Sequence, residues 1–76
     1  MIESAPRYFI RVDERSGVVM NVSRRTVGVP WENWDRLQGG WIKVGDDVAR
    51  KLEEYVNFGE MTPVTETVAL GTIAAL

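Results

Sequence analysis

The chain has 76 residues, a length at which one small domain folds with little stability to spare. It contains no cysteine and no histidine, which excludes disulfides, Cys/His zinc sites, thiol nucleophiles and imidazole bases. The formal net charge of -2 is ordinary for a small protein. It favours neither a nucleic acid nor an anionic membrane as a partner.

Charge is distributed unevenly along the chain. Residues 1–25 carry five arginines against three acidic residues, whereas residues 26–76 carry four basic against eight acidic residues. This split is typical of a solvated surface with both signs of charge, and it also allows head-to-tail contact between copies of the chain. The side chains that could make such electrostatic contacts are Arg11, Arg24, Arg25, Glu53 and Glu54.

The sequence predicts neither membrane insertion nor export. No run approaches the ~20 apolar residues of a spanning helix, and the first residues, MIESAPRY, lack the basic and apolar regions of a signal peptide. We therefore expect a cytoplasmic protein, either free or incorporated in a virus particle.

Residues 8–22 predict an antiparallel hairpin. Apolar side chains recur at every second position along YFIRVD and again along VVMNVS, which is the period of a strand. The turn falls at residues 13–17, DERSG, where Gly17 suits a position with positive φ. One apolar and one mixed face on each strand predict a sheet that is covered on one side.

The segment VPWENWDRLQGGWIKV holds all three tryptophans of the chain. Pro30 suits the first position of a helix, the apolar residues that follow it are spaced by three, and two glycines then interrupt the pattern. These features predict a short helix at 30–38, and WIKV predicts a strand near 41–44. We expect Trp34 and Trp41 in the core and Trp31 at the surface, because three tryptophans exceed what a small sheet readily covers.

Residues 46–58 predict an amphipathic helix. Its apolar residues repeat at helical spacing, Asp46 can cap its first turn, and Gly59 can end it. The segment 62–76 is ambiguous, because a Thr-Pro pair can begin a helix whereas its β-branched residues prefer a strand. Of the two, we favour an extended segment up to Leu70.

Together these elements predict one α+β domain over residues 1–70. A small antiparallel sheet, made of the hairpin and the strand near 41–44, packs against the two helices on one side. The apolar end of the chain, residues 71–76, is expected to dock on the domain or on a partner, since such an end otherwise frays.

No pattern in the sequence predicts catalysis, a metal site or a cofactor. The neighbouring carboxylates at 46–47 and 53–54 point about 100° apart on a helix, so neither pair converges on one substrate atom. The glycines of GGWIKVGDD lead to two aspartates, which would repel a phosphate. We therefore expect neither an enzyme nor a small-molecule substrate.

The expected function is that of a non-enzymatic structural or assembly protein, a small accessory subunit of a larger particle such as a phage virion. The apolar end, the charge split and the number of tryptophans motivate this hypothesis. The expected protein-binding residues are Trp31, Leu70, Ile73 and Leu76. An alternative is a small phage-type inhibitor or adaptor that docks on one partner and blocks a host enzyme or defence complex.

A minor alternative is binding of single-stranded nucleic acid. It would place bases on exposed Tyr8 and Phe9, beside the arginines of the first 25 residues. The absence of lysine in that part of the sequence and the negative net charge disfavour it.

Overall fold

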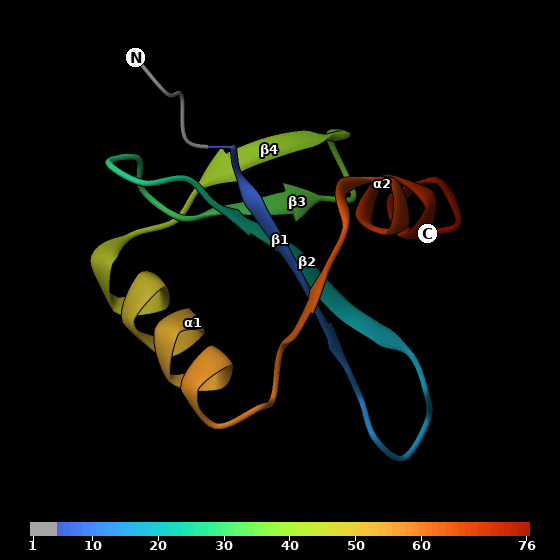
Figure 1. Ribbon diagram of the computed structural model, residues 1–76. Coiled ribbons are helices and arrows are strands. Elements are labelled where there is room, and N and C mark those ends of the chain that lie inside the picture. Colours follow the sequence, from blue (N-terminus) through green and yellow to red (C-terminus); the bar gives the residue numbers. More distant parts are fainter. Residues whose placement is uncertain (1–4) are drawn as a thin grey trace.

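The computed structural model describes residues 5–76 of the chain. These residues form a five-stranded antiparallel sheet with the strand order β4-β3-β2-β1-β5, together with two helices (Figure 1). The predicted α+β class is confirmed. The elements are β1 (Arg7–Val12), β2 (Val19–Arg25), β3 (Glu32–Asp35), β4 (Gly40–Lys43), α1 (Asp46–Asn57), β5 (Thr62–Val64) and α2 (Glu66–Ala74).

The predicted N-terminal hairpin is confirmed as β1 and β2. Asp13 holds its loop, because the side-chain Oδ1 accepts a hydrogen bond from the Arg15 N–H at 3.0 Å. The Asp13 carbonyl accepts a second bond from the Gly17 N–H at 2.8 Å. Gly17 has a φ of 72°, which glycine adopts without the steric penalty of a Cβ atom. The turn sequence D-x-x-x-G therefore determines where the chain reverses.

The helix predicted at 30–38 is wrong, because this segment forms β3 and a second hairpin turn. The geometry of the first turn is repeated: Asp35 Oδ1 accepts from the Leu37 N–H at 3.0 Å, and the Asp35 carbonyl accepts from the Gly39 N–H at 2.8 Å. Gly39 also has a φ of 72°. The sequence DRLQG satisfies its own backbone groups in a turn, so ENWD pairs with GWIK. The strand predicted at 41–44 is confirmed as β4.

Gly39→Ala is expected to lower the free energy of unfolding by about 1–2 kcal/mol, because positive φ brings a Cβ atom too close to the backbone. The matched control is Gly40→Ala, since Gly40 lacks a positive φ and its added Cβ would meet no atom within 4 Å. Urea unfolding of the two variants measures the difference. Equal stabilities would show that the turn does not depend on the conformation of Gly39.

The two helices lie on opposite faces of the sheet, so the expectation of a sheet covered on one side is wrong. Successive residues of a strand point to opposite faces, and β1 carries buried apolar side chains in both directions. The core on the α2 face consists of Tyr8, Ile10, Val22 and Ala69. The core on the α1 face consists of Phe9, Trp31, Leu52 and Met61. Each helix therefore covers a small core of its own.

The amphipathic helix predicted at 46–58 is confirmed as α1. Its N-cap is Gly45, without a side-chain hydrogen bond, so the prediction that Asp46 caps the helix is wrong. Asp46 lies in the first turn instead, where a negative charge interacts favourably with the helix dipole. Gly59 follows the helix with a φ of 75°, and its N–H donates to the Val56 carbonyl at 3.3 Å. The predicted stop at this glycine is confirmed.

The segment from residue 62 onward forms β5 and then α2, so the extended conformation favoured up to Leu70 is wrong beyond β5. Thr65 marks the change, because its side chain caps α2 by accepting a hydrogen bond from the Val68 N–H at 3.2 Å. β5 pairs with β1 at one edge of the sheet. The domain boundary expected between residues 70 and 71 falls inside α2.

Candidate protein-interaction surface

Trp31 is part of the core, and the expectation that it lies at the surface is wrong. Its side chain is only 5% exposed, and its ring packs against Phe9 at a centroid distance of 5.3 Å. The indole Nε1 donates to Glu53 Oε1 at 2.9 Å, and the backbone carbonyl accepts from the Val44 N–H at 3.0 Å. Trp31 therefore holds β1, the segment before β3 and α1 together.

The arginines expected to make electrostatic contacts with other molecules have contacts within the chain. Arg24 forms an ion pair with Glu32 at 2.8 Å, and Arg25 forms one with Glu53 at 2.7 Å. The guanidinium of Arg11 lies 4.3 Å from the centre of the Tyr55 ring. The charges of β1 and β2 are thus used largely to hold the sheet and α1. The remaining candidate, Glu54, is exposed on α1.

Glu53 accepts hydrogen bonds from Arg25 of β2 and from Trp31, which precedes β3, and these bonds perturb its ionisation. The bond from the Arg25 guanidinium, followed by the bond from the Trp31 indole, lowers the pKa of Glu53, whereas desolvation raises it. In the second ion pair, the hydrogen bond with Glu32 raises the pKa of Arg24. The two shifts favour the charged forms of Glu53 and Arg24 within the fold.

The aromatic residues proposed as a platform for nucleic-acid bases are not exposed. Tyr8 and Phe9 are both buried, so the expectation of exposed rings is wrong. Because the two residues are adjacent on β1, they point to opposite faces of the sheet. Tyr8 packs near Trp41 at a centroid distance of 5.9 Å, and Phe9 packs against Trp31. Neither ring is available for stacking by bases.

The helix α2 is apolar on nearly all sides, yet only one side packs on the sheet. Ala69 is fully buried, at 0% exposure, and Ile73, one turn later, packs against the same core. Ile73, expected to bind a partner, therefore contributes to the fold. Glu66, at the first position of the helix, is its only charged residue. A helix that is apolar all round is typical of a position buried on more than one side.

Two of the expected protein-binding residues, Leu70 of α2 and Leu76 after its end, are exposed. Leu70 is 46% exposed and Leu76, just after the helix, is 47% exposed. Val68 is exposed to a similar degree. The helical turn of about 100° per residue places the exposed small residues of α2 opposite its buried stripe. These small residues are Thr67, Gly71 and Ala74.

Other exposed apolar side chains lie both in regular elements and in loops. Val12, Val18 and Met20 lie at the loop end of the β1–β2 hairpin, Ile42 lies on β4 and Val48 lies on α1. Leu37, at the tip of the β3–β4 hairpin, is 98% exposed. Val27 and Phe58 are also exposed in the turns that follow β2 and α1. Single exposed apolar residues are normal on protein surfaces. We regard α2 as the stronger candidate for an interaction surface, because it is apolar on nearly all sides and also exposes Val68 and Leu70.

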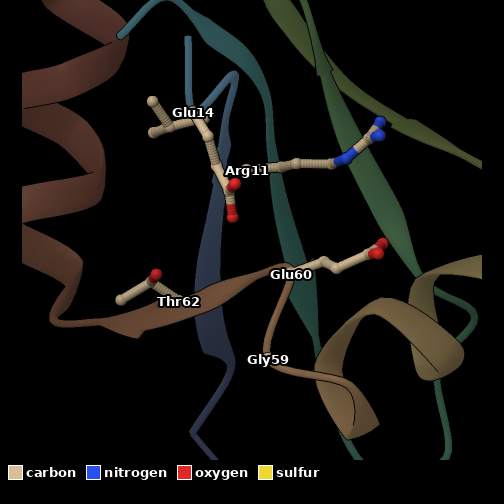
Figure 2. A pocket seen from close by; sticks show the side chains of 6 residues that line it. Arg11, Glu14, Gly59, Glu60 and Thr62 are labelled. Atoms are coloured by element: carbon tan, nitrogen blue, oxygen red, sulfur yellow. The ribbon is translucent and has the colours of Figure 1, made fainter.

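An open hollow of about 380 Å3 lies where β1 ends beside the connection from α1 to β5 (Figure 2). Its lining consists of Arg11, Val12, Glu14, Gly59, Glu60 and Thr62. Figure 2 shows the Arg11 and Glu60 side chains extending in the same direction. One guanidinium and two carboxylates give the lining a net negative charge, which disfavours an anionic ligand.

Residues 5–76 show neither a metal-binding cluster nor a helix that could span a membrane. Within residues 5–76, no group of three or more acidic, cysteine or histidine side chains converges in a way that could hold a metal ion. The helices of this same part of the chain are too short to cross a membrane. No family model, no curated protein and no solved structure matches the chain.

Proposed function

We propose that the chain is a non-enzymatic assembly protein, a small accessory subunit of a larger particle such as a phage virion. In this proposal, the outer side of α2 docks on a neighbouring protein in the particle. The observation that carries the proposal is the apolar character of α2 on nearly all sides, although only its Ala69 and Ile73 side packs on β1.

The outer side of α2 is suited to close packing by a protein partner. The small residues Thr67, Gly71 and Ala74 leave the helix backbone accessible on this side. The larger exposed side chains of Val68 and Leu70 flank them. A partner can therefore approach the helix closely and cover both larger side chains. Each Å2 of apolar surface removed from water contributes roughly 25 cal/mol, so covering these residues favours docking.

The ion pairs of the fold support an apolar rather than an electrostatic mode of assembly. Arg24 and Arg25 are paired with glutamates of the same chain, so they contribute less to a contact with the acidic residues of another copy. An assembly that depended mainly on the charge split would weaken steeply with added salt. An assembly held by α2 should persist, because hydrophobic burial is not screened by salt.

Replacing both Leu70 and Leu76 with serine is expected to reduce incorporation of the chain into its particle at least about tenfold, which corresponds to ~1.4 kcal/mol. Both side chains are nearly half exposed, so the fold should be retained. The matched control replaces Val27 and Leu37 with serine, which removes two exposed apolar residues away from α2. Quantitative isolation of tagged variants from the native source measures the incorporated fraction. Equal loss in both double variants would contradict a specific role of α2.

A further inference from the structure

The two edge strands of the sheet differ in their capacity to accept another strand. β5 has three residues and carries Pro63, which lacks a backbone N–H and is typical of a protected edge. β4 is the outer strand at the other edge, and its sequence GWIK contains no proline. In Figure 1 β4 forms the upper rim of the sheet and both helices lie below it. Among residues 5–76, the edge of β4 is therefore the one open to pairing.

The hydrogen bonds between β3 and β4 determine which backbone groups of β4 are free. The Val44 N–H donates to the Trp31 carbonyl at 3.0 Å, next to the pair of Glu32 with Lys43. Hydrogen-bonded and non-hydrogen-bonded pairs alternate along an antiparallel ladder. The backbone groups of Trp41 and Lys43 consequently point away from β3, toward the open edge.

We propose that β4 pairs with β4 of a second copy of this chain, antiparallel and across a two-fold axis at Ile42. Trp41 of each copy then exchanges backbone hydrogen bonds with Lys43 of the other, so one contact satisfies the outward groups of both strands. The sheet continues from one copy into the next. This inference rests on the proposed function as an assembly protein and names the second copy as a neighbour.

The side chains of β4 match this symmetric register. Ile42 is 47% exposed and lies opposite Ile42 of the second copy, where burial of both side chains favours the pair. On the other face of the sheet, Lys43 lies beside Trp41 of the second copy. A lysine on an edge strand often discourages pairing, but in this register the two lysines do not face each other. Each lies beside Trp41 of the other copy, whose ring already has the Arg24 guanidinium 4.4 Å from its centre, so the apolar part of the lysine side chain makes this contact.

The short length of β4 predicts a weak contact. An interface of less than ~1,200 Å2 is typical of transient association. In a particle, docking through α2 brings neighbouring copies to a high effective concentration, which strengthens a weak contact without any new interaction. Pairing of β4 therefore supplements the docking of α2 and does not replace it.

A cysteine crosslink tests the register directly, because the chain has no cysteine of its own. In the proposed pair the two residues at position 42 are about 4.5 Å apart at Cα, which lies within the range of a disulfide. Under mild oxidation, the Ile42→Cys variant is expected to form a covalent dimer about tenfold faster than the Leu37→Cys control. Leu37 is 98% exposed and lies outside the pairing. Equal rates for both variants would overturn the proposal.

Amide hydrogen exchange of the wild-type chain provides a second readout. The Trp41 and Lys43 amides are expected to gain protection as the protein concentration rises toward about 1 mM, the range of a weak interface. The Ile42→Lys variant should lose this gain, because it places like charges opposite each other. Exchange rates that do not depend on concentration would contradict the pairing.

The variants separate failure of this inference from failure of the proposed function. If Ile42→Cys forms no specific crosslink while the serine variant of Leu70 and Leu76 still loses incorporation, β4 pairing is wrong and the assembly role of α2 stands. If the crosslink forms but that serine variant assembles normally, β4 pairing stands and docking through α2 is wrong.

Discussion

The Trp31→Ala variant is expected to lose about 3–5 kcal/mol of unfolding free energy. Trp31 is 5% exposed, so its truncation opens a cavity against Phe9 and removes the hydrogen bond to Glu53. Folded proteins have roughly 0.05–0.15 kcal/mol of stability per residue, which is about 4–11 kcal/mol for a chain of 76 residues, so such a loss takes a large share of it. Chemical unfolding followed by far-ultraviolet circular dichroism measures it.

Two control variants separate the contributions to this effect. Trp31→Phe retains an aromatic ring in the core but removes the N–H donor, so it should cost less than Trp31→Ala. Leu37→Ala truncates a side chain that is 98% exposed and should change stability by less than about 0.5 kcal/mol. A Trp31→Ala variant as stable as Leu37→Ala would contradict the assignment of Trp31 to the core.

The second large effect is expected for Ala69→Asp, at about 3 kcal/mol or more. Ala69 lies on the inner side of α2 and is fully buried against the core side chains of the sheet, Tyr8, Ile10 and Val22. A carboxylate at this position would be buried without a partner, which is costly, and α2 would have to move off the sheet. The measurement is the unfolding free energy together with the protection of α2 amides from hydrogen exchange.

Thr67→Asp is the matched control for this variant. It introduces the same charge on the same helix, but at an exposed position in the first turn. There a negative charge interacts favourably with the helix dipole, so stability should be unchanged or slightly higher. Equal destabilisation by both variants would show that the cost comes from the charge on α2 in general and not from burial at Ala69.

The first hairpin and α1 could be predicted because their signals are local. The turn sequence DERSG follows directly on a strand in which apolar and polar residues alternate. In α1 the apolar residues repeat at helical spacing up to the glycine at position 59. The second hairpin was missed although DRLQG has the same D-x-x-x-G spacing as DERSG. β3 has only four residues, too few to show an alternation, whereas the three-residue spacing of Trp31, Trp34 and Leu37 also fits a helix.

The burial of Trp31 could not be predicted, because it depends on contacts distant in sequence. Phe9 of β1 and Glu53 of α1 come together at this residue only once the sheet and α1 have formed. The side of α2 that faces the sheet could not be predicted either, because it is determined by the packing of Ala69 against β1, which is distant in sequence. The cap at Thr65 was the local signal for this helix, but the β-branched residues beside it favoured a strand.

The proposal that the chain acts by assembly is tested most directly by the mass of the complex that contains it in its native source. After gentle isolation, light scattering or mass photometry should give a particle many times heavier than the 8.6 kDa chain, with more than one copy of the chain in each particle. A complex with a single copy and a single partner would support an inhibitor or adaptor instead. A chain found only as an 8.6 kDa monomer would contradict assembly altogether.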